Sequence, residues 1–155
     1  MTIVIGCDSF ALSLKNMLIG FLESREIIIE NMGTDNTDDP EYYPLIAKRV
    51  CNNIINSGFT KRGILLCGTG IGMCITANKF KGIRAAVCHD TYSAERSILS
   101  NNCNVLCMGE RVIGHELAKK IAGEWISLTY KDGPSTPKLK KLSDIEEELN
   151  PNLSG

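Results

Sequence analysis

The sequence has 155 residues, of which 43% are hydrophobic and 23% charged, and its formal net charge is -1. This length and composition fit one globular domain and exclude fibrous and disordered chains. The nearly balanced charge gives no reason to expect a nucleic acid or an anionic membrane as a partner. We expect a single domain over residues 1–150 and a short tail over 151–155.

Short apolar runs alternate with longer amphipathic stretches along the chain. Strands are predicted at 3–5, 27–29, 64–66, 83–87 and 105–106. Helices are predicted at 10–24, 41–57, 71–80, 92–100 and 111–127. Most runs are β-branched or bounded by glycine, as buried parallel strands are, whereas Ile46, Val50 and Ile54 recur with helical spacing. The alternation predicts a Rossmann-like three-layer α/β/α sandwich with a parallel sheet of about five strands, and ligands in such sheets bind at the carboxyl ends of the strands.

The last part of the chain differs in character from the rest. A turn-rich connector follows Tyr130 and runs to Pro137. A charged amphipathic helix is then predicted at roughly 138–148, with an apolar stripe along one side. The stripe is too isolated to stand alone, so we expect this helix to pack on the same domain or to extend to a partner subunit.

The cysteine pattern indicates the cellular compartment. The chain has seven cysteines, an odd number without a Cys-x-x-Cys pair, and its two histidines are His89 and His115. This pattern favours free thiols in a reducing compartment and argues against a structural zinc site. The apolar run Thr2–Ile5 is too short for a signal peptide or a membrane span. We therefore expect a cytoplasmic protein that holds no metal ion.

A glycine-rich segment, Cys67-Gly68-Thr69-Gly70-Ile71-Gly72, lies between the predicted strand 64–66 and the helix that follows. Its glycines allow the backbone to approach a ligand closely, and its amides favour negative charge, including a thiolate on Cys67. Cys67 could then carry a proton between C1 and C2 of a sugar. The amides of Gly68 to Gly72 and the Thr69 hydroxyl would stabilise the enediolate. A glycine-rich turn with a buried cysteine remains the alternative interpretation of this segment.

Dinucleotide binding is another interpretation of the same glycines. Gly68-x-Gly70 opens a helix, and Asp90 stands about twenty residues further on, where a ribose-binding acid would be expected. The third glycine of that motif would be residue 73, which is Met73. The spacing therefore disfavours a dinucleotide cofactor.

An ordered series of segments carries a family resemblance. The segments are Gly63–Met73, Ala77-Asn78-Lys79, Lys81–Ala86, His89-Asp90, Tyr92-Ser93-Ala94, Asn104–Leu106 and Gly109–Gly114. Together they resemble the ribose-5-phosphate isomerase B and galactose-6-phosphate isomerase family. A looser match reaches back through Tyr43-Pro44 and Gly33-Thr34 to Gly6-x-Asp8, so the resemblance covers most of the chain.

The resemblance implies an aldose–ketose isomerase of sugar phosphates with a Rossmann-like fold and without a metal or organic cofactor. It also implies a homodimer, with a tetramer left open, whose two sites lie at the subunit interface. In this family Cys67 takes the position of the base, and the anion hole is formed by Gly68, Thr69, Gly70 and Gly72. A binding protein of the same family that does not turn over its sugar phosphate is the alternative.

Further residues are assigned by the same resemblance. Asp8 would bind sugar hydroxyls, Tyr43 would line the pocket and Asn101 would hold a sugar oxygen. Arg111 would add positive charge, in its own subunit or across the interface. The alternatives are a helix-capping role for Asp8 and a plain surface charge for Arg111. His89 lies in the family pattern, but we expect its role to be structural.

Two histidines of the family pattern are replaced in this chain. Ser9 stands where the family usually has the histidine of Asp-His-Ala-Gly, and Ser100 stands where it has the histidine credited with opening the furanose ring. Both serines remain candidates for contact with substrate. The arginines of the family's tail are also missing, and Lys138 stands at the later one, which makes Lys138 a candidate phosphate ligand.

The missing ring-opening histidine bears on the substrate. In a tetrose 4-phosphate O4 is esterified, so no furanose ring can form and no ring-opening acid is needed. The runs Asp8-Ser9, Thr91–Arg96 and Ser100–Asn102 also look like the D-erythrulose-4-phosphate isomerase branch of the family. This favours D-erythrulose 4-phosphate and D-erythrose 4-phosphate as the substrate pair. Ribose 5-phosphate, which would place the enzyme in the pentose phosphate pathway, is the other candidate.

Overall fold

The structure is a computed structural model that describes residues 1–151, so positions 152–155 of the predicted tail lie outside the described residues. Its centre is a five-stranded sheet in the order β2-β1-β3-β5-β4, and every neighbouring pair is parallel. The strands are β1 (Thr2–Cys7), β2 (Ile28–Asn31), β3 (Arg62–Cys67), β4 (Ala85–Val87) and β5 (Val105–Gly109). The predicted parallel sheet of about five strands is confirmed.

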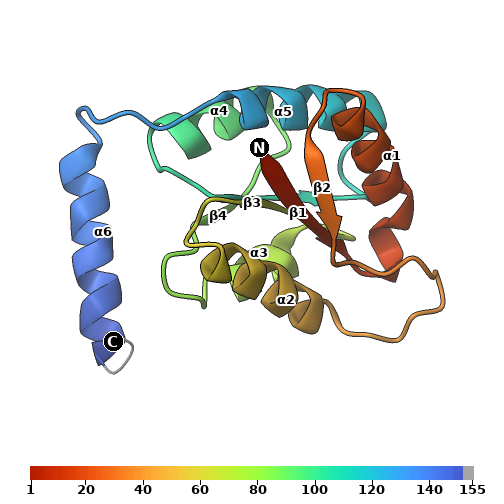
Figure 1. Ribbon diagram of the computed structural model, residues 1–155, viewed down its shortest axis with the longest axis horizontal. Helices are drawn as coiled ribbons and strands as arrows, with labels where there is room; N and C mark the ends of the chain where they lie inside the picture. Colours follow the sequence, from red (N-terminus) through yellow and green to blue (C-terminus); the bar gives the residue numbers. More distant parts are fainter. Residues whose placement is uncertain (152–155) are drawn as a thin grey trace.

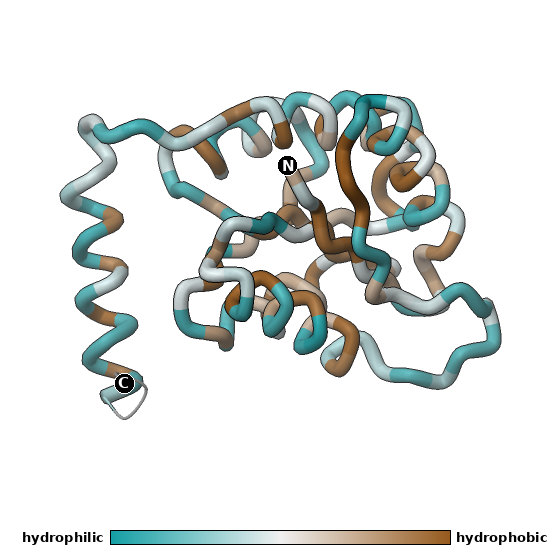
Figure 2. The backbone as a smooth tube through the Cα atoms, in the orientation of Figure 1, coloured by the Kyte–Doolittle hydropathy of each residue, from teal (hydrophilic) through white to brown (hydrophobic). Residues whose placement is uncertain are grey.

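Helices cover both faces of this sheet (Figure 1). They are α1 (Leu12–Glu23), α2 (Tyr43–Asn56), α3 (Ile71–Ala77), α4 (Thr91–Leu99), α5 (His115–Ser127) and α6 (Thr136–Leu149), and a 3₁₀ turn, Ser9–Ala11, leads into α1. Two apolar cores result, one between the sheet and α1, α4 and α5, the other between the sheet and α2 and α3. Figure 2 shows the brown, hydrophobic positions gathered on the strands, whereas the loop from β2 to α2 is largely hydrophilic.

Two predicted helix boundaries were wrong. Helix α3 ends at Ala77 rather than at residue 80, because the Asn78 side chain pairs with the backbone of Ala85, with its amide donating to the Ala85 carbonyl at 2.9 Å. Helix α5 begins at His115 rather than at residue 111, because the amides of Val112 and Ile113 donate to the Gly109 carbonyl and so close a separate turn, whose Arg111 amide donates to the carbonyl of Gly68 at 3.1 Å. Residues 110–114 therefore form a turn that lies against the glycine-rich segment.

Helix α6 stands apart from the three layers at the side of the sheet where β4 lies (Figure 1). None of its residues is buried, and Leu142, Ile145 and Leu149 are exposed. Its Glu146 carboxylate accepts a hydrogen bond from the Gly82 amide at 3.0 Å. The predicted apolar stripe is thus present, but the rest of residues 1–151 does not bury it. No helix within these residues is both long and apolar enough to cross a membrane.

The amino end of β3 is tied to the end of α5. The Arg62 guanidinium donates to the carbonyl oxygens of Trp125, Ile126 and Leu128, and its central carbon lies 4.5 Å from the centroid of the Trp125 ring. Carbonyls at a helix end have no partner within the helix, so these bonds satisfy groups that burial would otherwise penalise. The Trp125 indole N–H donates to Ser97 of α4 at 3.1 Å. Trp125 therefore joins α4, α5 and the sheet.

We predict that Trp125→Ala lowers the free energy of unfolding by about 3–5 kcal/mol, because a large side chain with no exposed area is removed from the core. Urea unfolding followed by circular dichroism measures this change. Tyr92→Ala is a matched control, since this ring is 72% exposed and its loss is expected to change stability by less than about 0.5 kcal/mol. Equal losses in the two variants would contradict the role assigned to Trp125.

Candidate active site

The glycine-rich segment lies at the carboxyl edge of the sheet, where the strand order changes direction. β1 connects outward to β2 on one side, while β3 is followed by strands on the other side. In the sheet register Leu66 is paired with Cys7, and Cys67 is paired with Gly109. The ends of β1, β3 and β5 therefore meet around Cys67. Parallel α/β sheets bind their ligands at this kind of crevice.

Cys67 is the last residue of β3, and only 6% of its surface is exposed. Its sulfur accepts a hydrogen bond from the Gly70 amide at 3.1 Å. The turn that follows Cys67 therefore holds its sulfur in place at the carboxyl edge of the sheet.

Gly70 is required for this hydrogen bond. Its φ is +78°, and a Cβ at this position would lie 2.9 Å from the carbonyl carbon of Met108. A larger residue would be strained in the left-handed region and would collide with β5. Gly70 thus allows the turn to fold back so that its amide reaches Cys67.

Thr69 is exposed, and its hydroxyl oxygen accepts a hydrogen bond from the Ile71 amide at 3.3 Å. A hydroxyl that accepts in this way still has its own hydrogen to donate. The amides of Gly70 and Ile71 are therefore engaged with side chains of the turn. By contrast, the structure records no backbone acceptor within residues 1–151 for the amides of Gly68, Thr69 and Gly72, which leaves these amides and the Thr69 hydroxyl as candidate donors for a substrate oxygen.

Tyr43 lines the turn from the first position of α2. Its ring lies so close to Gly72 that a Cβ there would be 2.5 Å from the phenol Cζ and 2.9 Å from the hydroxyl oxygen. Glycine at position 72 thus makes room for the ring. The structure places Tyr43 against the glycine-rich segment, and its contact with a substrate stays a prediction.

A buried lysine positions the loop that precedes Tyr43. Lys15 has no exposed surface, and its ammonium group donates to the Thr34 carbonyl at 2.5 Å and pairs with the Asp35 carboxylate. The hydrogen bond from Lys15 lowers the pKa of Asp35. The loop between β2 and α2 is therefore fixed to α1 at its start.

Asp8 follows β1 and is 8% exposed. Its carboxylate accepts a hydrogen bond from the Phe10 amide at 3.1 Å and so caps the turn Ser9–Ala11. Asp8 therefore has the helix-capping contact that was the alternative interpretation. The positive charge of Arg111 also acts on the Asp8 carboxylate. Burial raises the pKa of Asp8, whereas the Phe10 amide and the positive charge of Arg111 oppose this rise. Ser9 lies in the same turn.

Arg111 lies on the same side of the sheet as Cys67 and in the same chain. Its Cδ is 3.7 Å from the position that a Cβ on Gly68 would occupy, and its guanidinium carbon is 4.7 Å from the centroid of the Phe10 ring. Arg111 therefore adds a positive charge directly beside the residue that follows Cys67. The sequence analysis did not identify Phe10 as a site residue, because an aromatic residue after Asp8 gives no signal of the partner that it contacts.

Glu110 is a second residue that the sequence analysis did not identify. Its carboxylate accepts a hydrogen bond from the Leu14 amide in the first turn of α1 at 2.7 Å, and its own amide donates to the Cys67 carbonyl at 3.0 Å. The contacts join β3, the end of β5 and α1. Glu110 thereby holds together the turn after β1, which carries Asp8, and the turn that carries Arg111.

Ser100, Asn101 and Lys138 do not lie with the other predicted site residues. Ser100 caps the carboxyl end of α4, and residues 101–104 lead into the start of β5, so Ser100 and Asn101 lie at the amino edge of the sheet. The five residues of β5 span about 16 Å, which separates this edge from Cys67. Lys138 is exposed on the first turn of α6. Within one chain, the predicted residues therefore form two separate groups.

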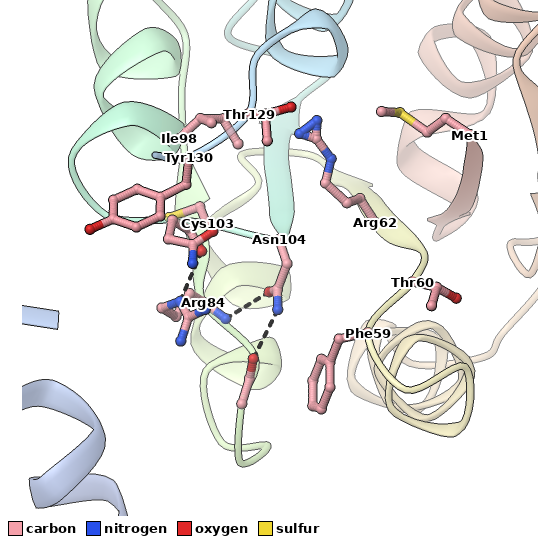
Figure 3. Close-up of a pocket in the computed structure, with 12 residues that line it drawn as sticks. Met1, Phe59, Thr60, Arg62, Arg84, Ile98, Cys103, Asn104, Thr129 and Tyr130 are labelled. Atoms are coloured by element: carbon pink, nitrogen blue, oxygen red, sulfur yellow. Dashed lines mark hydrogen bonds between the residues drawn. The ribbon is translucent and has the colours of Figure 1, made fainter. Parts of the chain in front are cut away.

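A cavity of about 540 Å³ opens at this amino edge and not at Cys67 (Figure 3). In it the Asn104 side chain accepts from the Arg84 amide and donates to the Gly82 carbonyl, both at 2.8 Å. A second cavity, of about 520 Å³, contains Asn101 and reaches Leu142 and Glu146 of α6. Both cavities lie away from the proton-transfer group that the sequence predicts.

His89 contributes to the structure of the carboxyl edge. Its Nε2 accepts a hydrogen bond from the Gly109 amide at 2.9 Å, so this nitrogen carries no proton. Burial lowers the pKa of His89, and the charge of Asp90 only partly offsets this effect. The contact supports the structural role expected for His89. No group of three or more His, Cys, Asp and Glu side chains in residues 1–151 is arranged to hold a metal ion.

Comparisons with known proteins show which family this chain resembles in sequence and fold. The family model described as Ribose/Galactose Isomerase matches residues 3–142. The chain is 47% identical over 148 residues to the D-erythrulose-4-phosphate isomerase of Pectobacterium atrosepticum, covering 96% of this chain and 97% of that protein. It is 43% identical to D-erythrulose-4-phosphate isomerase 2 of Mycolicibacterium smegmatis, covering 92% and 93% of the two chains. The solved structure of ribose-5-phosphate isomerase B from Clostridium thermocellum superposes with a TM-score of 0.91 at 36% identity, covering 96% of this chain and 99% of that one.

The lowered pKa of His89 predicts a loss of stability at acidic pH. Below the usual pKa of histidine the unfolded chain binds a proton that the folded chain resists, so stability falls as the pH drops from about 6.5 towards the lower folded pKa. His89→Gln keeps an acceptor for the Gly109 amide but does not titrate. We expect the difference in Tm between pH 8 and pH 5, measured by calorimetry, to be smaller in this variant than in the wild type. An unchanged difference would contradict the prediction.

Proposed function

The chain belongs to the ribose/galactose isomerase family and is an aldose–ketose isomerase of sugar phosphates, and we propose that it interconverts D-erythrulose 4-phosphate and D-erythrose 4-phosphate with Cys67 as the base. One observation carries the assignment of the base. The Cys67 sulfur lies at the carboxyl edge of the sheet and accepts a hydrogen bond from the Gly70 amide at 3.1 Å. A protein that only bound the sugar would have no need of a proton-transfer group at this point.

The proposed reaction moves one proton between two carbons. The Cys67 thiolate takes a proton from C2 of the aldose, and the electron pair of that C–H bond forms the enediolate while the carbonyl oxygen at C1 becomes negative. The amides of Gly68 and Thr69 and the Thr69 hydroxyl stabilise this oxygen. The thiol then returns the proton to C1, and the hydroxyl proton at O2 is transferred to O1, which gives the ketose. Asp8 and Tyr43 bind the sugar beside the turn.

The replaced histidines support the four-carbon sugar. Ser9 and Ser100 stand where the family pattern has histidine, and the second of these histidines opens a furanose ring. Because a tetrose 4-phosphate cannot close that ring through O4, its isomerisation needs no acid at position 100. The names of the two relatives at 47% and 43% identity also support the tetrose. Ribose 5-phosphate, with a place in the pentose phosphate pathway, is the second candidate, because the similar solved structure is a ribose-5-phosphate isomerase B.

We further propose that the working enzyme is a homodimer, or a tetramer built from such dimers, with each site shared between two copies. Ser100, Asn101 and Lys138 lie away from Cys67 in their own chain, so they reach a Cys67 only if they belong to a second copy. The exposed apolar stripe of α6 supports this arrangement, since a partner would bury it. Lys138 of the second copy would then join Arg111 at the phosphate. A place in the cytoplasm stays a prediction from the free thiols.

Proton NMR in deuterated buffer tests the reaction and the substrate. We expect the wild type to convert D-erythrose 4-phosphate faster than D-ribose 5-phosphate and to incorporate deuterium at the carbon that gains the proton. Cys67→Ala is expected to lose at least about 100-fold in kcat, because removal of a general base costs about 10²–10⁴. Comparable rates for the two sugars would contradict the tetrose assignment, and full activity in Cys67→Ala would contradict the base assignment.

Mixing two impaired variants tests the shared site. Cys67→Ala and Asn101→Ala are each expected to have low activity as pure proteins. After random exchange of subunits, half of the dimers contain both variants and each of these has one intact site of two, so about a quarter of the wild-type activity should return. A mixture no more active than its parents, or an Asn101→Ala variant with full activity, would show that Asn101 does not complete the site of another copy.

A further inference from the structure

Phe10 is a large aromatic residue at the carboxyl edge that contributes little to either core. Its ring is 60% exposed and lies outside both buried clusters. One face of the ring is nevertheless occupied, because the Arg111 guanidinium carbon lies 4.7 Å from its centroid. A cation within about 6 Å of a ring centroid is attracted by the negative face of the ring. The Phe10 ring therefore packs against a charged group of the candidate site, the Arg111 guanidinium.

The position of the ring is set by the site itself. The Phe10 amide donates to the Asp8 carboxylate at 3.1 Å, and the two residues share the 3₁₀ turn that follows β1. Asp8 is nearly buried, so it anchors the backbone from which the ring projects. The Phe10 ring thus stands at a fixed place relative to β1, and through the register of β1 and β3 relative to Cys67.

Arg111 needs such a support. Its side chain is exposed, and the ion pairs of residues 1–151 do not include it. A carboxylate would orient the guanidinium but would also neutralise it and occupy its N–H groups. An aromatic face orients the guanidinium by stacking and leaves the edge of the fork free for a bidentate oxyanion.

We infer that Phe10 is a positioning residue: its ring holds the Arg111 guanidinium over Gly68, so that the N–H groups of Arg111 are presented to the phosphate of the substrate. The inference rests on the proposed function, in which Arg111 binds that phosphate. Binding of phosphate to a guanidinium that is already oriented loses less rotational freedom than binding to a free one. Phe10 therefore lowers the KM for the sugar phosphate and takes no part in proton transfer.

The chain offers a matched control for this contact. Arg25 lies 4.4 Å from the centroid of the Phe21 ring on α1, where the pair packs beside Gly123 of α5 and away from the site. Phe21→Leu removes a stack of the same kind and geometry. It is expected to leave the KM, kcat and phosphate affinity unchanged.

The test compares Phe10→Leu, Phe10→Tyr and Phe21→Leu. For Phe10→Leu we expect the dissociation constant of inorganic phosphate, from calorimetric titration, and the KM for D-erythrose 4-phosphate to rise together by about 2- to 5-fold, the range of an exposed cation–π contact. We expect kcat to change less than KM. Phe10→Tyr keeps an aromatic face, so we expect the dissociation constant of phosphate and the KM to stay at their wild-type values. A purely structural role for the ring would not require this result.

A double-mutant cycle decides whether Phe10 acts through Arg111. In an Arg111→Gln background, Phe10→Leu should have no further effect on phosphate affinity, whereas full additivity of the two changes would overturn the inference. Unchanged phosphate affinity in Phe10→Leu alone would also overturn it. The titration uses inorganic phosphate, so its result stands apart from the sugar assay. A wild type that binds phosphate but fails to isomerise erythrose 4-phosphate would count against the proposed substrate and not against Phe10.

Discussion

The register of three parallel strands is the constraint on which the site depends. Cys7 is paired with Leu66, and Gly109 is paired with the next residue, Cys67, so β1, β3 and β5 end within one residue of one another. Each strand then delivers one chemical group: Asp8 follows β1, Cys67 ends β3 and Arg111 follows β5. A shift of one residue in any pair would turn the delivered side chain to the opposite face of the sheet. The buried apolar residues on both faces, which fix the register, therefore also fix the acid, the base and the cation relative to one another.

Close backbone packing also fixes the position of the turn that follows β3. A Cβ at Gly109 would lie 2.5 Å from the backbone of Thr69, and a Cβ at Gly72 would lie equally close to the Tyr43 ring. The turn after β3 is thus confined between β5 on one side and α2 on the other. This confinement directs the Gly70 amide at the Cys67 sulfur, because the turn has no room to relax. The glycines supply space at three contacts and a left-handed conformation at one of them, Gly70.

The sequence predicted the parallel sheet because its strands leave local signals, whereas most of the candidate site residues were predicted only through the family resemblance. Continuous apolar runs mark the buried parallel strands, and apolar residues that recur with a period of 3.6 mark the helices. The glycines after Cys67 indicate a tight turn, but their spacing alone does not distinguish an anion-binding turn from a structural one. The boundaries of α3 and α5 were missed because Asn78 and Arg111 make hydrogen bonds to residues outside their own helices, Ala85 and Gly68. Phe10 and Glu110 were missed for the same reason, since their partners, Arg111 and Leu14, are chosen by the fold. The separation of Asn101 from Cys67 follows from strand direction, which the spacing of motifs does not reveal.

In the proposed dimer this separation would connect catalysis with assembly. The carboxyl edge of one chain has the proposed base, the proposed donors for an oxyanion and one cation, but the residues at the positions of the family's ring-opening and phosphate-binding groups lie at the opposite edge or on α6. The α6 stripe is an apolar surface left without cover in the described chain, and Lys138 lies on the same helix. Burial of Leu142, Ile145 and Leu149 against a second copy would release apolar surface from water, and it would carry Lys138 with it. The hydrophobic energy of association and the electrostatics of phosphate binding would then be supplied by the same helix, so that a separated chain would lack both.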